Sequence, residues 1–333
     1  MQQNEIIVTR IRPSAFQARD LDREANVDDS DVHIDPMLME IIVCPDCRSG
    51  LDEAQGMLTC ASCSSRYPIS GGIPRLIPAA FDVEHLREEE SLAAMMRQKE
   101  TEPDMQFNLR QWDQSKVEFW NVVRAQLPGD PRRLINIGCG NDPHYVPLTT
   151  AGHMVVNFEL VFEMLRGLRA GCPAGHYVNG DLKHLPFRSA AFDYVISIDV
   201  IHHECDHLAE LFRSWLSLLK PGGTLFLEDP NAWGLFQMAK SIFMPRTVYR
   251  RLRSTYHWLR SSDHRPADYE FPTNAWQVKS LLSDLGFEQI RFYPHTAYPT
   301  IGRQSYNIYK WLSASDYMRT YHNYHYMLSA VRA

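Results

Sequence analysis

Four of the seven cysteines are spaced in a way that can bind a metal ion. Cys44 and Cys47 form one CxxC pair, and Cys60 and Cys63 form a second pair further along the chain. Two such pairs can place four thiolates tetrahedrally around one Zn²⁺, about 2.3 Å from each sulfur, with no open position for catalysis. A closed site of this kind stabilises a module that is too small for a core of its own. We therefore expect a structural zinc site, with reduced, metal-free cysteines as the alternative.

A second signal is a glycine-containing turn that directly follows an apolar strand. Gly138 and Gly140 come after Leu134–Ile137, and glycine lets the backbone approach a bound cofactor because a Cβ atom would collide with it. Glu159 follows the next strand, at the position where an acid can accept hydrogen bonds from both ribose hydroxyls. Asp181 follows a third strand. Each acid alone is also consistent with a solvated loop residue, but their joint spacing favours a nucleotide-type cofactor.

The residues after a fourth expected strand are the candidates for catalysis. Asp199, His202 and His203 directly follow Tyr194–Ile198. In open α/β sheets the ligand lies beyond the carboxyl ends of the strands. A histidine there could act as a general base, because its pKa lies near neutrality. The alternative is that one histidine of the pair packs or hydrogen-bonds within the loop.

The residues around the cysteine pairs resemble a known family. The matching segments are Met39–Cys47, Leu58–Cys63, Tyr67–Ile69 and Gly72–Pro74. They are similar to the small zinc-ribbon activator that partners tRNA and protein methyltransferases. The resemblance implies structural zinc, and it implies a methyltransferase partner, which that family normally stabilises in trans.

The glycine turn and the segments that follow it resemble the class I methyltransferases that use S-adenosyl-L-methionine, especially the ubiquinone-biosynthesis-like branch. The ordered set that carries this resemblance is Leu134–Gly140, Glu159, Gly180–Phe187, Ala191–Ile196, Ser197–His203 and Leu218–Leu225. By this resemblance, Gly138 and Gly140 approach the methionine part of the cofactor and Glu159 approaches its ribose. Asp181 and Leu182 approach the adenine.

Two positions depart from the pattern of that family. The family usually has an acid where Asn136 stands and a third glycine where Asp142 stands. Asn136 can still hydrogen-bond to the cofactor's amino group, and Asp142, if it faces inward, could supply the missing carboxylate. Both are included, with Ile198 of the fourth strand, in the expected cofactor site. The full GxGxxG motif of NAD enzymes is absent, because His144 stands where its last glycine would be.

Strand-like and helix-like segments alternate through the second half of the chain. Strands are expected at Leu134–Ile137, Met154–Phe158, Tyr177–Val178, Tyr194–Ile198, Thr224–Leu227 and Gln289–Phe292, and helices at Leu160–Leu168, Leu208–Leu219 and Asn274–Leu285. The alternation predicts an α/β fold with a parallel sheet covered on both faces. Together with the two resemblances, it implies a doubly wound, mostly parallel Rossmann-like methyltransferase sheet with a small N-terminal zinc-ribbon domain. Tyr324–Val331 is expected to pair antiparallel at the sheet edge.

The chain divides into four parts on this interpretation. These are a flexible leader over 1–35, the zinc ribbon over 36–80, connecting helices over 81–127 and the methyltransferase domain over 128–333. An insertion over 232–270 is rich in aromatic residues and arginine, which suit an apolar body and an anionic group respectively. It is expected to form a lid over the acceptor, and an amphipathic helix packed on the core is the alternative.

Composition narrows the partners and the compartment. The 333-residue chain has a formal net charge of −6, which does not attract nucleic acid or anionic membranes globally. No apolar run of about 18 residues is present, so we expect no integral membrane segment. The N-terminus lacks the apolar region of a secretory signal, and paired CxxC motifs suit a reducing compartment, so a cytoplasmic location is expected.

The leading hypothesis is a methyltransferase that acts on an O, N or C nucleophile of a small molecule, with an anionic or amphipathic acceptor in view of the arginine-rich insertion. A tRNA or protein methyltransferase is the alternative that the ribbon's relatives suggest. Against it, the loop after the fourth strand lacks the Asn-Pro-Pro-Tyr sequence of the amino-group methylases in that set. A hypothesis of another class is a non-catalytic scaffold that binds a partner through its ribbon. The acceptor atom and the oligomeric state stay open.

Overall fold

The computed structural model describes residues 33–99, 103–235, 272–296 and 314–333, together with positions 238, 307 and 311. The predicted leader falls outside these residues except for its last three positions, and so does most of the insertion predicted at 232–270. Within the described part of the chain, no helix is both long and apolar enough to cross a membrane.

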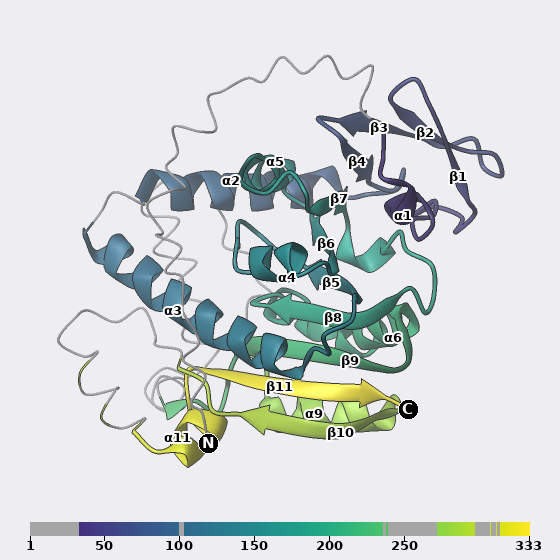
Figure 1. The fold of residues 1–333 in the computed structure, drawn as a ribbon. Coiled ribbons are helices and arrows are strands. Elements are labelled where there is room, and N and C mark those ends of the chain that lie inside the picture. The colour runs from purple at the N-terminus through teal and green to yellow at the C-terminus, as the bar shows by residue number, and fades with distance from the viewer. Residues whose placement is uncertain are drawn as a thin grey trace.

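A single mixed sheet runs through the molecule and is flanked by helices (Figure 1). Its strands are β1 (Leu51–Ala54), β2 (Met57–Cys60), β3 (Arg66–Ser70), β4 (Ile73–Leu76), β5 (Arg133–Ile137), β6 (Met154–Glu159), β7 (His176–Gly180), β8 (Phe192–Ile198), β9 (Leu219–Pro230), β10 (Phe287–Tyr293) and β11 (His325–Arg332). The strand order is β1-β2-β3-β4-β7-β6-β5-β8-β9-β11-β10.

The helices are short except for two before the parallel strands. They are α1 (Pro36–Met39), α2 (Val83–Lys99), α3 (Pro103–Gln126), α4 (Val146–Thr150), α5 (Phe162–Gly171), α6 (Leu208–Leu218), α9 (Ala275–Asp284) and α11 (Asp316–Tyr321), with 3₁₀ turns η4 (Leu182–His184), η5 (Ile201–His203) and η6 (Cys205–His207). Strands β7, β6, β5, β8 and β9 pair in parallel, which confirms the predicted α/β fold with a mostly parallel sheet.

Helices cover both faces of the sheet, because strand side chains alternate between two apolar clusters. Leu134 of β5 and Phe226 of β9 belong to the cluster that Trp120 of α3 and Leu165 of α5 share. The positions next to these two residues along β5 and β9, Ile135 and Leu225, belong to the other cluster, which contains residues of α6 and α9. Successive strand residues point to opposite faces, so one stretch of β9 supplies side chains to both layers.

The last strand does not lie at the sheet edge, which corrects the prediction. β11 is antiparallel to β9 on one side and to β10 on the other, so β10 is the edge strand. The burial pattern gives the physical reason: the first six residues of β11 are all buried, whereas most of β10 is half-buried or exposed. A strand buried on both faces must be covered on both edges as well, because its backbone polar groups need partners.

The cysteine-containing module extends this sheet. β4 pairs in parallel with β7, with Arg75 opposite Asn179 and Leu76 opposite Gly180. Leu38, Tyr67 and Leu76 share one buried apolar cluster with residues of the parallel strands. The predicted ribbon and the predicted methyltransferase domain are therefore continuous in both hydrogen bonding and core.

Candidate functional site

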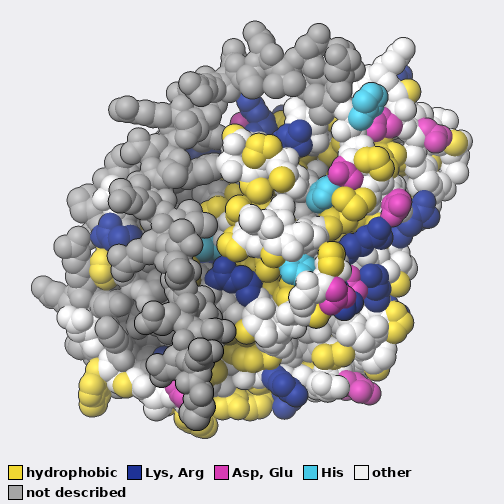
Figure 2. All heavy atoms as spheres, in the orientation of Figure 1, with side chains coloured by type: hydrophobic (Ala, Val, Ile, Leu, Met, Phe, Trp, Pro, Cys, Tyr) yellow, Lys and Arg dark blue, Asp and Glu magenta, His cyan; other side chains and the backbone are white. Residues whose placement is uncertain are grey.

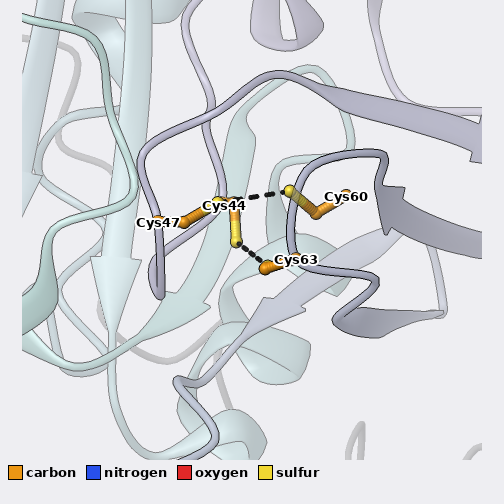
Figure 3. A group of neighbouring side chains, drawn as sticks. All are labelled: Cys44, Cys47, Cys60 and Cys63. Carbon is orange, nitrogen blue, oxygen red and sulfur yellow. Dashed lines mark hydrogen bonds between the residues drawn. The ribbon is translucent and has the colours of Figure 1, made fainter.

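The four paired cysteines converge, as their spacing predicted (Figure 3). Their Sγ atoms all lie within 4.8 Å of one another, with 3.6 Å between Cys44 and Cys63 and 3.4 Å between Cys47 and Cys60. Four sulfurs about 2.3 Å from a tetrahedral Zn²⁺ are about 3.8 Å apart, so the thiols are close to coordination geometry. The site fits a structural zinc ion.

Two equivalent turns aim the thiols at this point. Arg48 N donates to Cys44 O at 2.9 Å and Ser64 N donates to Cys60 O at 2.8 Å. Arg48 and Ser64 both adopt the left-handed conformation, at φ 67° and 60°. The repeated geometry explains why two separate CxxC sequences present their sulfurs in the same way.

The buried side chain of Tyr67 contacts the cysteine cluster through its hydroxyl group. The hydroxyl of Tyr67 lies 3.1 Å from Sγ of Cys44 and donates a 2.6 Å hydrogen bond to Oδ2 of Asp46. The other oxygen of Asp46 accepts a hydrogen bond from Ala79 N. Such partners orient metal ligands, and the sequence motif alone did not reveal them.

The glycine turn follows β5 as predicted, but packing constrains its first glycine. Gly138 has φ +65°, and a Cβ there would lie 2.4 Å from Cγ2 of Val200. Gly140 has φ +53° and no heavy atom closer than 4.0 Å to an added Cβ. Gly138 is thus required by the protein's own interior, while the open space at Gly140 suits a bound ligand.

Glu159 closes the turn from the end of β6. Its Oε2 accepts a 2.9 Å hydrogen bond from Gly140 N, and its Oε1 accepts one of the same length from Val161 N. Each carboxylate oxygen can accept a second hydrogen bond, so the pair expected from ribose hydroxyls remains available. Burial raises the pKa of Glu159, although these backbone hydrogen bonds oppose the shift.

Asp181 is buried at the start of the turn η4. Its oxygens accept hydrogen bonds from Lys183 N at 3.1 Å and from Nδ1 of His184 at 2.7 Å. Leu182 is half-buried beside it, and Ile198 is buried at the end of β8. The adenine contacts of Asp181 and Leu182 remain predictions.

Asn136 and Asp142, the two residues that depart from the family pattern, both have hydrogen-bond partners within the protein. Asn136 is buried, and its Nδ2 lies 3.5 Å from Oδ1 of Asn157, the residue opposite it on the paired strand β6. Asp142 is 3% exposed and accepts hydrogen bonds from Nε1 of Trp120 at 2.8 Å and from His144. Burial alone would raise the pKa of Asp142, but Lys116 and His144 lower it to about 2.

His202 forms a dyad with an aspartate from the end of β9. Its Nδ1 lies 2.9 Å from Oδ1 of Asp229, whose Oδ2 accepts a 2.7 Å hydrogen bond from Thr273. Thr273 is in turn 2.8 Å from the hydroxyl of Tyr326. Burial lowers the pKa of His202, but Asp229 outweighs it and raises that pKa. The ring of His203 lies beside that of His202, with centroids 4.2 Å apart.

Asp199 belongs to a different cluster on the α3 side of the sheet. Its Oδ1 is 3.5 Å from Nδ1 of His325, which also hydrogen-bonds to Oε1 of Glu228. Nε2 of His295 lies 3.2 Å from the same Glu228 oxygen. Burial lowers the pKa of His325, but Glu228 and Asp199 raise it to about 9. No sequence motif pointed to His295 and His325, because each lies about a hundred residues or more from the fourth strand and only strand pairing brings them there.

Two family models match the regions that the sequence singled out. Residues 135–227 match the methyltransferase domain, and residues 35–72 match the Trm112p-like protein family. Both resemblances drawn from the motifs are confirmed. The first match contains the glycine turn, Glu159, Asp181 and His202, and the second contains all four paired cysteines.

Curated relatives match the central part of the chain. A tRNA U34 carboxymethyltransferase from Geobacter sp. (strain M21) is 30% identical over 139 residues, which cover 38% of this chain and 39% of that protein. A ubiquinone biosynthesis O-methyltransferase from Xanthomonas campestris pv. campestris is 30% identical over 115 residues, covering 33% and 47%. The chain thus spans less than half the length of each of these relatives.

Solved structures resemble the chain more remotely. Magnesium protoporphyrin IX methyltransferase from Synechocystis aligns with 18% identity and a TM-score of 0.48, covering 76% of this chain and all of that one. A Haloferax volcanii complex of the Trm112 methyltransferase activator with a methyltransferase aligns with 15% identity and a TM-score of 0.45, covering 74% and 96%.

Proposed function

Because the chain carries a methyltransferase domain behind a Trm112p-like zinc ribbon, we propose that it is an S-adenosyl-L-methionine-dependent methyltransferase acting on a hydroxyl group of a small molecule. The observation that carries the hydroxyl acceptor is the dyad of His202 and Asp229 at the carboxyl end of the parallel strands. A hydroxyl must lose a proton when it is methylated, and this dyad is built to receive one.

The described residues fit the cofactor. Glu159 holds its carboxylate at the glycine turn with acceptor capacity left for two hydroxyls. Gly140 has room for a ligand against its backbone, and Asp181 follows the adjacent strand β7. When bound, S-adenosyl-L-methionine supplies a methyl group on a positively charged sulfur.

His202 then acts as the general base. Asp229 accepts the hydrogen bond from Nδ1, which leaves Nε2 to take the proton of the acceptor hydroxyl. The bound cofactor would supply the methyl group to the acceptor oxygen, which His202 has freed of its proton. Asp229 stabilises the resulting imidazolium, and Thr273 fixes the orientation of Asp229.

A tRNA acceptor is the second candidate, favoured by the relatives named tRNA U34 carboxymethyltransferase. The charge distribution of the described residues argues against it. Acidic and basic side chains are interspersed over the ribbon and its junction with the sheet on the face seen in Figure 2. Lys183 pairs with Glu204 at 3.0 Å, and Arg48 donates to the carbonyls of Leu185 and Phe187. A phosphate backbone needs clustered cations instead.

Two measurements on the zinc-loaded full chain test the proposal. Isothermal titration should show binding of S-adenosyl-L-methionine. Glu159→Gln should weaken this binding at least about tenfold, because the amide replaces one of the two acceptor oxygens with an NH₂ donor. Glu163→Gln is the matched control, because the Glu163 side chain on α5 is 47% exposed. Absence of binding would favour a non-catalytic scaffold.

The acceptor class is tested with the labelled methyl group. Incubation with a metabolite extract, total RNA and total protein should transfer label only to a small product of the ether type, which is stable to base. A base-labile product would be a methyl ester and would contradict the hydroxyl acceptor. Label recovered in RNA would instead establish the second candidate, and label in protein would exclude both.

A further inference from the structure

Four side chains of types that can ligate metals meet at one end of the sheet because of its strand order. Asp199 follows the carboxyl end of β8, and Glu228 lies near the carboxyl end of β9. β11 is antiparallel, so its first residue, His325, lies at this same end, opposite Pro230. His295 follows the end of β10 two residues later and reaches the cluster from the neighbouring loop.

The distances between these groups are those of ligands around one ion. One ligand atom each from Asp199, Glu228 and His325 lies within 4.8 Å of the others. Nδ1 of His325 contacts both carboxylates, at 3.5 Å for Asp199 and in a direct hydrogen bond for Glu228. Within the described chain, this group and the four cysteines are the two clusters that satisfy such a distance criterion.

Burial distinguishes this cluster from an ordinary acidic surface. The side chains of Glu228 and His325 are 2% and 8% exposed, whereas that of Asp199 is 42% exposed. Two ligands are thus held rigidly inside the protein, and the third faces solvent at the carboxyl edge. A site with three protein ligands and an open side is typical of a catalytic metal and not of a structural one.

Partners behind the cluster hold its ligands in place. Nε2 of His295 lies 3.2 Å from Oε1 of Glu228 and 3.0 Å from Oγ of Ser115 on α3. Asn323 donates to the carbonyl of His295. Outer contacts of this kind orient carboxylates for coordination.

We propose that Asp199, Glu228 and His325 form a binding site for a divalent transition-metal ion. Two carboxylate oxygens and one imidazole nitrogen suit Mn²⁺, Fe²⁺ or Zn²⁺. The proposal concerns binding and does not depend on methyl transfer. Its role does rest on the proposed function: a cation beside the His202 dyad would lower the pKa of an acceptor hydroxyl and orient its oxygen.

Mn²⁺ is the probe, because it is paramagnetic and competes poorly for four thiolates. The full chain, with its cysteine site filled with zinc, is titrated with Mn²⁺ and free Mn²⁺ is followed by electron paramagnetic resonance. We expect one Mn²⁺ site per chain. Asp199→Asn and Glu228→Gln should each weaken it at least about tenfold, the effect of losing one charged ligand.

Asp199→Asn is the decisive variant, because asparagine tolerates the left-handed backbone at this position, where φ is +58°. Asp206→Asn, an exposed acid in the turn η6, is the matched control and should bind Mn²⁺ like the parent chain. Circular dichroism and zinc content confirm that each variant is folded.

Two results would overturn the metal site: no Mn²⁺ binding by the zinc-loaded chain, or equal binding by Asp199→Asn and the parent. The cluster would then be an ion-pair network neutralised by a proton. Since Mn²⁺ binding is measured without S-adenosyl-L-methionine, and cofactor binding without Mn²⁺, failure of one proposal is distinguishable from failure of the other.

Discussion

The indole Nε1 of Trp120 donates a 2.8 Å hydrogen bond to Oδ2 of Asp142, and this bond ties α3 to the glycine turn. Asp113, also on α3, lies 3.2 Å from His144, which bonds to the same aspartate. Both Trp120 and Asp142 are almost fully buried. Asp142 therefore anchors α3 to the glycine turn, and a direct contact between its carboxylate and the cofactor's amino group stays a prediction.

Trp120→Phe tests this anchor. The change keeps the aromatic ring but leaves a buried carboxylate oxygen without its donor, which should cost about 1–3 kcal/mol of unfolding free energy. Cofactor affinity should fall to the same extent in Trp120→Phe and Asp142→Ala, as titration calorimetry can measure. If only Asp142→Ala loses affinity, the carboxylate contacts the cofactor directly and the anchoring role is wrong. Asp130→Asn, an exposed acid, is the control.

The two glycines of the turn should respond differently to alanine. Gly138→Ala places a methyl group 2.4 Å from Val200 at positive φ, so we expect severe destabilisation in urea unfolding. Gly140→Ala meets no atom closer than 4.0 Å and should cost only the backbone strain of about 1–2 kcal/mol. Adding Val200→Ala should partly rescue Gly138→Ala. Equal stability of the two single variants would disprove the packing explanation.

Zinc removal should affect the whole molecule, because the ribbon shares a sheet and a core with the parallel strands. Chelation, or Cys47→Ser, should lower the midpoint of one cooperative thermal transition and weaken cofactor binding. The effect on binding follows because β4 supports β7, which leads directly to Asp181. Cys205→Ser, outside the cluster, should retain zinc. A zinc-free chain that binds cofactor normally would show that the ribbon is independent.

Methyl transfer should depend on pH through His202. The base must be neutral, and because Asp229 raises its pKa above 6.5, kcat/KM should rise with pH to values beyond neutrality. Asp199 and His325 also act on this group, in opposite directions. Asp229→Asn should shift the rising limb to lower pH and reduce the maximum. A profile that is flat from pH 6 to 9 would exclude His202 as the base.

Stability should fall on the alkaline side through His144. Burial lowers the pKa of this residue, but Asp113 and Asp142 raise it from 6.5 to about 9. A raised histidine pKa contributes stability that is complete below the unfolded value near 6.5 and is lost as pH rises through about 9. His325 titrates over the same window. His144→Gln should therefore reduce, and not abolish, the decrease in urea midpoint between pH 6.5 and 9.5, and an unchanged slope would refute the assignment.

The sequence by itself determined the features that local spacing controls. Two CxxC pairs specify a four-sulfur site, because each knuckle is a short turn whose geometry depends on few residues. The alternation of apolar segments predicted the parallel strands, and the order of Gly138, Glu159 and Asp181 placed them at successive strand ends. The residues in each of these patterns lie within about twenty to forty positions of one another, and turn and strand patterns can be recognised over that distance in the sequence.

Tertiary structure alone decided what depends on strand order and on distant packing. Insertion of β11 between β9 and β10 brings His325 to Glu228, and no local pattern encodes that neighbour. The need for glycine at position 138 comes from Val200, and the partner of Asp142 is Trp120 on a preceding helix. Such contacts form only when the whole sheet is assembled, because register and layer, not sequence proximity, set which side chains face one another.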